Sequence, residues 1–519
     1  MINLKKATPL LQFSALAVCV LFFFLTTADS VFTVHDDIVT YMQVQQGDLW
    51  NTILSDAKHG RVCHIILLPL LYIPYFFDSI PVIRVFSALS VIFNMTGLYQ
   101  LIKKNVDKNS AFLCTLLFIS FACISNQHNL FVSYTLAHQI PIGLILFSLV
   151  HFTDYYREEK TSSLIISAIL FTSAAMLYES MAAYIILFIL IAMYKSDGNI
   201  FSNLSKILYN THFHILFLLL YLVIYLAWRH MYPSDYDGAK LYFGNIPQSI
   251  ITMVIYTLGM TPGLPLGAMI LKKYITFSEF IENINIGLII IPLITAVIFY
   301  RYFSKINTPK NSRILSLFCI TAMIIPNIII CFTEKYVAWS QSNSYSYVTS
   351  FYSYFFMIPL FLLLLRCVFK GKVKKPTLIL LSSLVFVISL ASTVGNAAWN
   401  TYFKKNLDRY NAFSAIVKDD YFDSIPDGSI IYIPDYNGIH NDMEITKSFA
   451  KTYTTRDIYF ENKEENLDFS KNIICMRYDP ISHAVIIGSI DKSFMCSNFY
   501  VLGKYNASLP ETVDMKNIF

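Results

Sequence analysis

The apolar stretch LLQFSALAVCVLFFFLTT, residues 10–27, is followed almost at once by FTVHDDIVTYMQ, residues 32–43. An apolar run of roughly 20 residues is what a helix needs to cross the hydrocarbon core of a bilayer. The second stretch therefore places a histidine and two adjacent carboxylates beside a membrane surface. Neighbouring aspartates repel each other and are costly to desolvate, so we expect water, a metal ion or a substrate at this position.

The whole chain has the composition of a membrane protein. Of its 519 residues 55% are hydrophobic and 14% are charged, and the mean hydropathy is +0.52. An average soluble domain carries about 25% charged residues. The net charge of +5 is too small to indicate a nucleic-acid partner, and the sequence has no zinc-ligand spacing, Walker loop or dinucleotide-binding glycine pattern.

The positions of the basic residues predict the orientation of the chain. Lys5 and Lys6 precede the first apolar run, and further basic clusters occupy the short loops 103–108, 157–160, 301–313 and 366–375. By the positive-inside rule these loops and the N-terminus face the cytoplasm. A cleaved signal peptide ending near TTADS is the alternative for the first run, and it would also place residue 30 outside.

We predict a polytopic α-helical fold with eleven spans and a transmembrane domain over residues 1–395, whose outer loops are 28–80, 231–285 and 333–350. The spans are 10–27, 81–102, 111–126, 139–153, 163–177, 181–194, 213–230, 286–302, 314–332, 351–368 and 377–394. Two apolar stretches, 63–77 and 247–271, are interrupted by Pro or Gly, and we expect them to lie at the outer interface or to re-enter. Lys272 and Lys273 then fall outside, against the rule.

Residues 396–519 are expected to form a small α/β domain outside the membrane. Strand-like alternation or apolar runs mark 429–434, 456–460, 472–478 and 483–490, and DMEITKSFAKTY could form a helix between the first two. The domain has no nucleophile elbow or phosphate loop, which favours a binding or lid role. Cys475 and Cys496 both lie in this domain and could form a disulfide there.

The first outer loop is denser in ionisable groups than any other part of the chain. It contains His35, Asp36, Asp37, Tyr41, Asp56, Lys58, His59, Arg61 and His64. A carboxylate at the end of a span, beside a partly dry cavity, can act as a general base or ligate a divalent cation. Adjacent side chains on a helix diverge by about 100°, so we expect one aspartate of the pair to point into a site. The competing interpretation is a solvated loop whose acids cap the following helix.

Arginines at the predicted interface could hold a lipid phosphate, because the guanidinium group matches phosphate oxygens. Arg61 precedes the first in-plane stretch, Arg84 opens the second span, and Arg229 ends a later one. Snorkelling to lipid headgroups is the alternative use of such arginines.

Other candidates lie at the ends of later spans. Glu179 sits in AMLYESMAAY, at a predicted outer turn, where a buried structural glutamate is the alternative. Tyr236 and Asp237, in YLAWRHMYPSDYDGAKLYFGN, could bind sugar hydroxyls or belong to an interfacial belt. The stretch EKYVAWSQSNSYSYVTSFYSY, with Trp339, could stack sugars, although an aromatic girdle is the more common use of such residues.

The layout resembles the GT-C superfamily of integral-membrane glycosyltransferases. The resemblance rests on the acidic first loop, on FFDSIPVIRVFSALSVIFN after it, and on an outer α/β domain entered through SIPDGSIIYIP. It implies a polyprenyl-phosphate-sugar donor and chemistry on the outer face. It also implies that Asp36 or Asp37 is the base toward the acceptor hydroxyl, or a Mg²⁺ or Mn²⁺ ligand. Many members have a second acid where this chain has SNQHNLFVSYTLAHQIP, with His128 and His138 instead, which puts metal dependence in doubt.

The resulting hypothesis is an inverting glycosyltransferase of a bacterial inner membrane. It would move a sugar from undecaprenyl-phosphate-sugar to a cell-envelope glycan of the O-antigen or lipopolysaccharide kind. The expected catalytic residues are Asp36 and Asp37, and the expected substrate-binding residues are His35, His59, Arg61, Arg84, His138, Glu179, Arg229, Tyr236 and Asp237. A polysaccharide polymerase or ligase and a lipid-linked-sugar flippase or transporter are the alternatives.

Overall fold

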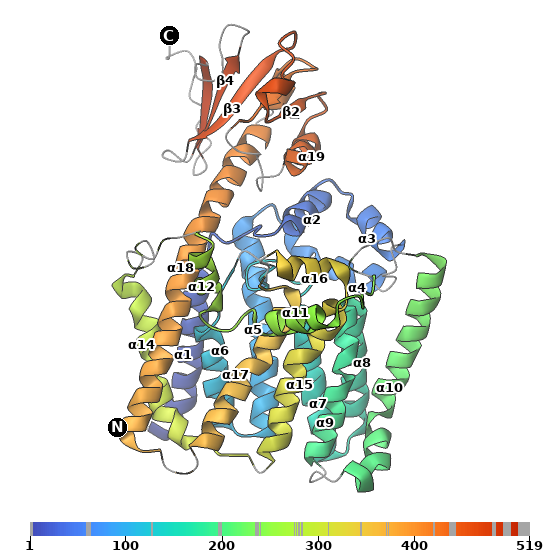
Figure 1. The fold of residues 1–519 in the computed structure, drawn as a ribbon, viewed down its shortest axis with the longest axis vertical. Coiled ribbons are helices and arrows are strands. Elements are labelled where there is room, and N and C mark those ends of the chain that lie inside the picture. Colours follow the sequence, from blue (N-terminus) through green and yellow to red (C-terminus); the bar gives the residue numbers. More distant parts are fainter. Residues whose placement is uncertain are drawn as a thin grey trace. The chain divides into compact units, whose positions relative to one another are not determined.

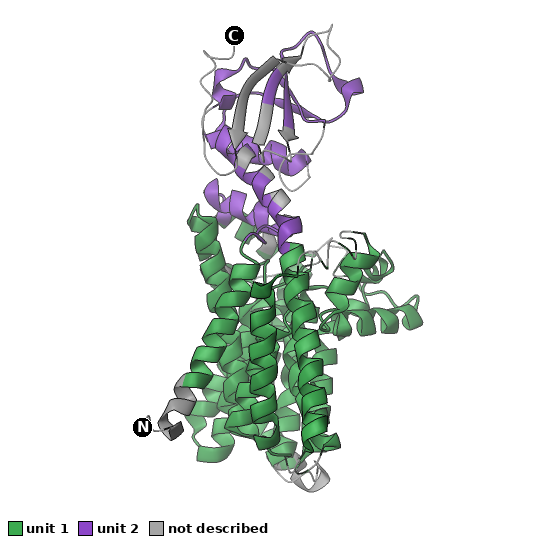
Figure 2. Cartoon of the chain, turned by 90° about the vertical axis from the view of Figure 1, so that its left-hand side faces the viewer, with its two compact units in different colours: residues 1–28, 50–399 green, residues 29–49, 400–519 purple. Residues whose placement is uncertain are grey.

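The structure is a computed structural model, and it divides the chain into two compact units (Figures 1 and 2). Unit 1 comprises Met1–Ala28 and Trp50–Trp399, and unit 2 comprises Asp29–Leu49 and Asn400–Phe519. The structure describes residues 4–506 except 59–63, 126–127, 196–199, 234–237, 239, 274–275, 277, 279–280, 282–283, 310, 343–344, 370, 372, 419–420, 435–442, 480–483 and 491–499.

Unit 1 is helical, and each of the eleven predicted spans falls on a helix. These helices are α1 (Leu4–Thr26), α5 (Ile80–Asn105), α6 (Lys108–Ser120), α7 (Ile140–Glu158), α8 (Thr161–Leu177), α9 (Ile185–Lys195), α10 (Ile200–Met231), α14 (Ile286–Tyr302), α15 (Ser312–Cys331), α17 (Val348–Val368) and α18 (Lys375–Lys418). Within the described residues six helices are long and apolar enough to cross a membrane, and shorter apolar helices accompany them. The predicted polytopic helical fold is confirmed.

Close packing of α5 against α7 shows how the sequence specifies this bundle. A Cβ added at Gly143 would lie 2.2 Å from Asn94 Oδ1 and 2.4 Å from the Phe93 ring, so only glycine fits this crossing. Asn94 is fully buried and its amide donates a hydrogen bond to the Gln139 carbonyl (3.0 Å). Small residues at helix crossings allow this kind of close approach inside a membrane.

The basic loops meet at one end of unit 1, which we call the basic end: loops 103–108, 157–160, 301–313 and 366–375. Lys104 pairs with Asp154, and Arg157 donates to the Lys104 carbonyl. The backbone N–H of Asn307 donates to the Asp107 carboxylate (3.3 Å), and the Arg366 guanidinium lies 5.6 Å from the centre of the Phe303 ring. The prediction that these loops share one side is therefore confirmed.

The segments predicted to face outward meet at the opposite end, which we call the loop end: Thr27 and residues 121–139, 178–184 and 333–352. Arg84, in the second turn of α5, donates to Thr27 and to the Phe131 carbonyl. The Tyr352 hydroxyl donates to the His138 carbonyl (2.7 Å). The 26 residues of α5 separate this end from the basic end.

Short helices cover the loop end. They are α3 (Leu49–Lys58), α4 (His64–Leu71), α11 (Ile246–Leu258), α12 (Leu264–Leu271) and α16 (Glu334–Gln341). The apolar stretch 247–271 is thus broken into α11 and α12, and Figure 1 shows α11 and α16 lying across the bundle. Tyr256 of α11 donates a hydrogen bond to the Tyr336 carbonyl of α16 (3.0 Å).

Unit 2 contains a five-stranded sheet with the order β2-β1-β3-β4-β5. The strands are β1 (Ile430–Tyr432), β2 (Tyr459–Glu461), β3 (Ile473–Asp479), β4 (Ala484–Ile490) and β5 (Tyr500–Asn506). β1 is parallel to β2 and β3, whereas β3, β4 and β5 pair antiparallel. The four predicted strands and the predicted helix, α19 (Met443–Tyr453), are present, and β5 was not predicted.

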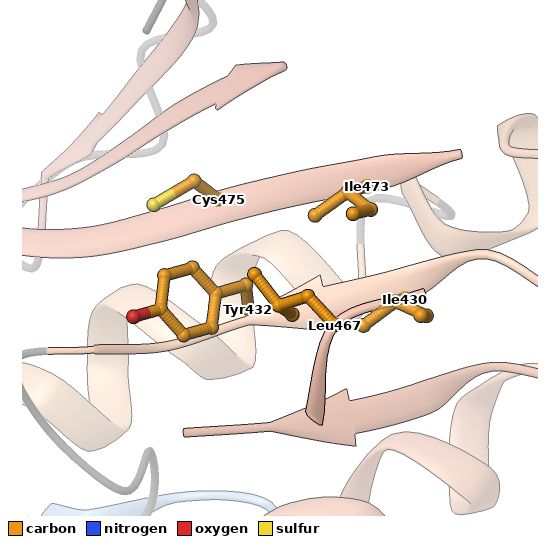
Figure 3. Close-up of a cluster of buried hydrophobic side chains, with 5 residues drawn as sticks. All are labelled: Ile430, Tyr432, Leu467, Ile473 and Cys475. Atoms are coloured by element: carbon orange, nitrogen blue, oxygen red, sulfur yellow. The ribbon is translucent and has the colours of Figure 1, made fainter. Parts of the chain in front are cut away.

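Two apolar layers hold the sheet. Figure 3 shows the core cluster on one face, made of Ile430, Tyr432, Leu467, Ile473 and Cys475. Aromatic rings form the other layer and come from α18, α19, β2 and a short 3₁₀ helix: Phe413, Phe422, Phe449 and Phe460. Cys496 lies outside the described residues, so its disulfide with Cys475 stays a prediction.

The acidic segment after α1 belongs to unit 2, which the sequence did not indicate. Its helix is α2 (His35–Gln45). Asp29 and Asn400 exchange hydrogen bonds of 2.9 and 3.0 Å, and the ring of Phe32 lies 5.1 Å from that of Tyr410 on α18. Residues 28–80 are thus not one loop of the transmembrane domain, because the burial of Phe32 and Tyr41 ties the first part to the C-terminal unit.

Candidate functional site

The two predicted catalytic acids occupy the first turn of α2 and differ in exposure. Asp36 is exposed, whereas Asp37 is only 4% exposed. The helix geometry explains the difference, since successive side chains diverge by about 100°. Val34 at the N-cap offers no side-chain hydrogen bond, and a negative charge in the first turn is favourable for the helix dipole. Asp37 is therefore the acid in the drier position, and both acids also serve the helix.

The segment that carries these acids is held firmly. Phe32 adopts φ +51°, which costs a non-glycine residue about 1 kcal/mol. Its ring packs against Tyr41 (5.4 Å) and Tyr410 (5.1 Å), and Ile38 is fully buried. Aromatic burial offsets the strain and fixes the start of α2, so the two carboxylates have defined and different environments.

A second group of residues gathers at the loop end of unit 1, and we call it the histidine–aromatic cluster: His128, Tyr134, His138, Tyr178, Trp339 and Tyr347. His128 Nδ1 lies 2.8 Å from the Tyr134 hydroxyl, and its ring stacks on Trp339 at 5.6 Å with an interplanar angle of 17°. Such a ring system, with a few polar atoms, is typical of sites for small polar ligands.

The cluster extends from His128 to a candidate acid. Tyr134 contacts His138 edge to face (4.7 Å), and His138 contacts Tyr178 (5.2 Å). Glu179 follows Tyr178 directly, at the start of the 3₁₀ helix η2 (Glu179–Tyr184), and is half-buried. The structure therefore brings His138 and Glu179, two of the predicted substrate-binding residues, into one neighbourhood.

Backbone strain marks the same loop. His128 has φ +46° and Tyr134 has φ +50°, both in the left-handed region that non-glycine residues rarely occupy. Such conformations are often found at functional sites, where the surrounding contacts over-determine them. Here the His128–Tyr134 hydrogen bond links the two strained residues.

Two lysines add positive charge to the loop end. Lys335 Nζ lies 4.9 Å from the centre of the Trp339 ring, and Lys272 Nζ lies 4.8 Å from that of Tyr345. Burial lowers the pKa of Lys272 below the ordinary value for lysine. Neither lysine was among the predicted phosphate-binding residues, although Lys272 was expected on this side.

Arg84 has structural partners in the described residues. It is 9% exposed, and one guanidinium nitrogen donates to the Thr27 carbonyl (3.0 Å) and hydroxyl (2.9 Å). The group also lies 5.2 Å from the centre of the Phe24 ring. These contacts tie α1 and the 121–139 segment to α5, and phosphate binding by Arg84 stays a prediction.

The structure describes the remaining predicted residues only in part, and their roles stay predictions. Arg229 is half-buried in the last turn of α10, next to Trp228, whose indole donates to the Ala57 carbonyl (2.6 Å). The positions of His59, Arg61, Tyr236 and Asp237 and the side chain of His35 lie outside what the structure describes. Among the described residues, no group of three or more His, Cys, Asp or Glu side chains is placed to hold a metal ion. The predicted Mg²⁺ or Mn²⁺ site at Asp36 or Asp37 stays a prediction.

No protein-family model matches the sequence, and no curated protein matches it. Among solved structures, the chain is similar to ArnT from Cupriavidus metallidurans bound to undecaprenyl phosphate, with 11% identity, a TM-score of 0.41 and coverage of 90% of this chain and 93% of that chain. It is also similar to the apo oligosaccharyltransferase of Archaeoglobus fulgidus, with 12% identity, a TM-score of 0.38 and coverage of 90% of this chain. That match covers 66% of the archaeal chain, slightly less than two thirds.

A third similar structure is the Archaeoglobus fulgidus oligosaccharyltransferase AglB in complex with an inhibitory peptide and a dolichol phosphate, with 11% identity, a TM-score of 0.36 and coverage of 98% of this chain and 78% of that chain. All three TM-scores lie below 0.5, so these similarities carry no conclusion about activity or substrate. Fold and helix composition define this chain as a multi-pass helical membrane protein with a small α/β unit.

Proposed function

We propose that this protein is a membrane glycosyltransferase that uses a polyprenyl-phosphate-linked sugar as donor. The observation that carries the proposal is the histidine–aromatic cluster, which assembles stacked rings, a hydrogen-bonded imidazole and nearby lysines at the loop end of unit 1. Aromatic faces suit the C–H faces of a sugar ring, and cationic side chains suit a phosphate. The basic end, by contrast, has the short charged loops expected of a cytoplasmic face.

A lipid-phosphate donor fits the chemistry that the sequence contains. The sequence has no recognisable nucleotide-binding motif, and a lipid-linked donor would not need one. A polyprenyl tail could lie along the apolar exterior of the spanning helices, and its phosphate could be held by Arg61, Arg84 or Arg229. Lys272 and Lys335 are further candidates, because the structure places both at the loop end.

The proposed reaction is a direct displacement at the anomeric carbon. Asp37 or Asp36 takes the proton of an acceptor hydroxyl as the acceptor oxygen bonds to the anomeric carbon. The bond from that carbon to the phosphate oxygen breaks, and polyprenyl phosphate leaves with the electron pair, stabilised by positive charge. A single displacement inverts the anomeric configuration. We favour Asp37 as the base because it is only 4% exposed and so occupies the drier position of the two acids.

The finer assignment is an undecaprenyl-phosphate-sugar donor and a cell-envelope glycan acceptor of the O-antigen kind, on the outer face of a bacterial inner membrane. The sequence resemblance supports it. If Asp36 or Asp37 instead ligates Mg²⁺ or Mn²⁺, transfer will stop in EDTA and resume when either ion is restored.

The experiment that tests the proposal uses the purified full-length protein, a synthetic undecaprenyl-phosphate-linked sugar and an envelope-glycan extract as acceptor. Release of undecaprenyl phosphate and labelling of the glycan are measured for the wild type, Asp36→Asn and Asp37→Asn. General-base catalysis is typically worth about 10²–10⁴-fold, so we expect Asp37→Asn to lose at least about a hundredfold in turnover. Asp48→Asn removes an exposed carboxylate just beyond α2 and is the matched control. Full activity of both Asp36→Asn and Asp37→Asn would end the catalytic assignment.

The same assay separates the alternatives. A flippase or transporter would move the lipid-linked sugar without releasing undecaprenyl phosphate, and a polymerase or ligase would require a pyrophosphate-linked chain. The charged residues inside the predicted spans, such as Arg84, Arg229 and Arg366, all lie within a few residues of a span end. Transporters usually place ionisable groups near mid-bilayer, so this distribution favours an enzyme acting at one face.

A further inference from the structure

An apolar pocket lies within unit 1 near the basic end. It is lined by the last two turns of α5, residues 356–366 of α17, the first two turns of α6 and α15, the last turns of α9, and the loop residues Ile306, Asn307 and Pro309. Its walls include Leu101, Leu190, Leu315, Phe318 and Leu363. The enclosed space is about 100 Å³, less than the roughly 300–1,000 Å³ typical of pockets that bury a whole small molecule, and the pocket has an open mouth. It therefore has room for part of a flexible hydrocarbon chain, whose remainder would lie in the open mouth.

One cation lines this apolar space. Arg366 is 6% exposed and donates through Nη1 to the carbonyls of Phe369 (3.1 Å) and Gly371 (3.4 Å). Its Nε is buried and has no hydrogen-bond partner among the described residues. A buried guanidinium with an unused donor is unfavourable unless an anion or another acceptor completes it.

An unused acceptor lines the same pocket. The Asn105 amide nitrogen donates to the Leu101 carbonyl (2.9 Å) and to the Thr153 hydroxyl (3.2 Å), and Asn105 Oδ1 is buried without a partner in the described part of the chain. A ligand that combines an anion with a hydroxyl group and a hydrocarbon chain would satisfy Arg366 Nε, Asn105 Oδ1 and the apolar wall together.

We propose that this pocket binds an anionic phospholipid of the phosphatidylglycerol type. Part of one acyl chain occupies the apolar space, the phosphate accepts from Arg366, and a headgroup hydroxyl donates to Asn105. The positive charge of the basic end, which includes Lys305 and Arg313, favours an anionic headgroup over a zwitterionic one. The pocket is separate from the proposed donor site, because Arg84 and Asn105 are 21 residues apart on α5, about 30 Å along the helix. The proposal does not depend on the proposed function.

The test measures thermal unfolding of the purified full-length protein in detergent micelles with three additives: phosphatidylglycerol, phosphatidylcholine and inorganic phosphate. A ligand that binds only the folded state raises Tm with its concentration. We expect phosphatidylglycerol to raise Tm and the other two to leave it unchanged. An equal rise with phosphatidylcholine would overturn headgroup recognition, and an equal rise with inorganic phosphate would show an anion site without a lipid.

Substitutions then test whether the response to phosphatidylglycerol arises at this pocket. Arg366→Gln removes the cation, and Leu315→Trp fills the pocket while keeping Arg366; we expect each to weaken the response to phosphatidylglycerol at least about tenfold in concentration. Lys374→Gln removes one exposed positive charge from the same end outside the pocket and is the matched control, with an unchanged response. Arg366→Lys retains a charge and serves if Arg366→Gln does not fold. A wild-type response in Leu315→Trp and in both Arg366 variants, or a loss in Lys374→Gln as large as theirs, would overturn the proposal.

Discussion

The two ends of unit 1 differ in the residues and contacts that form them. At the loop end, long segments fold back on the bundle and are joined by ring contacts and buried hydrogen bonds, as between His128, Tyr134 and Trp339. At the basic end, short loops carry lysine and arginine, with ion pairs such as Lys104–Asp154. Ordered polar and aromatic groups are costly to assemble, and their concentration at one end is the reason for proposing that the substrates bind there.

The largest effect is expected from a substitution that disrupts the packing of α5 against α7. Gly143→Ala would place a Cβ against Asn94 and Phe93 and force α7 away from α5, which typically costs about 1–3 kcal/mol of folding free energy. We expect a lower Tm and weaker expression. Gly267→Ala, on α12, meets nothing within 4 Å and is the control. A wild-type Tm for Gly143→Ala would show that the α5–α7 crossing is looser than described.

The next effect concerns the histidine–aromatic cluster. His128→Ala removes a hydrogen bond and ring contacts, each worth about 0.5–1.5 kcal/mol. If the cluster serves substrate binding, we expect kcat/KM for sugar transfer to fall roughly tenfold, together with a modest fall in Tm from the lost contacts. His212→Ala, at a half-buried histidine in the first half of α10, should leave transfer unaffected. A large fall in Tm without a change in kcat/KM would reduce the cluster to a structural role.

A smaller effect should depend on pH. Burial lowers the pKa of Lys272, so this side chain keeps its charge at low pH and loses it on the way to alkaline pH earlier than an ordinary lysine does. If Lys272 helps to hold the donor phosphate, KM for the donor will rise by a few-fold as pH rises through that range. Lys272→Gln should already have a raised KM for the donor at low pH, and its KM should increase less with pH than that of the wild type. An identical dependence of KM on pH in both proteins would count against this role.

The smallest effect is expected at the basic end. Asp154→Asn breaks the partly exposed pair with Lys104, and such pairs contribute at most about 1 kcal/mol. Transfer activity should stay within about twofold of the wild type, because the proposed substrate-binding cluster lies at the loop end of unit 1. A loss comparable to that of His128→Ala would remove the distinction between the two ends.

Much of this fold could be predicted because its signals are local. Each predicted span is a predominantly apolar run, even where a proline lies inside the helix as in α14, α15 and α17. The predicted strands of unit 2 have apolar runs or alternation, as in IICM at the start of β3. β5 was missed because YVLGKYN contains Gly, Lys and Asn and lacks a clear pattern. The assignment of residues 29–49 to unit 2 was missed for another reason: the contact of Phe32 with Tyr410 joins residues far apart in the chain.

The residues of the candidate site could also be predicted only in part from the sequence. His128 and His138 stood out because they replace acids expected from the family resemblance. Tyr134 and Tyr178 did not, since nothing local distinguishes them from the other tyrosines of this chain. Their role follows from contacts with His138, which only the folded chain reveals. Positive φ values at His128 and Tyr134 are equally invisible in the sequence.

The most direct measurement labels single introduced cysteines in intact cells with a membrane-impermeant thiol reagent, in a background without the native cysteines. Asp36→Cys reports on the acidic segment and Lys374→Cys on the basic end; both wild-type residues are exposed. The account predicts that position 36 reacts from outside and that position 374 reacts only after the membrane is opened. Protection of position 36 until the membrane is opened would place the acids in the cytosol and contradict glycosyl transfer on the outer face.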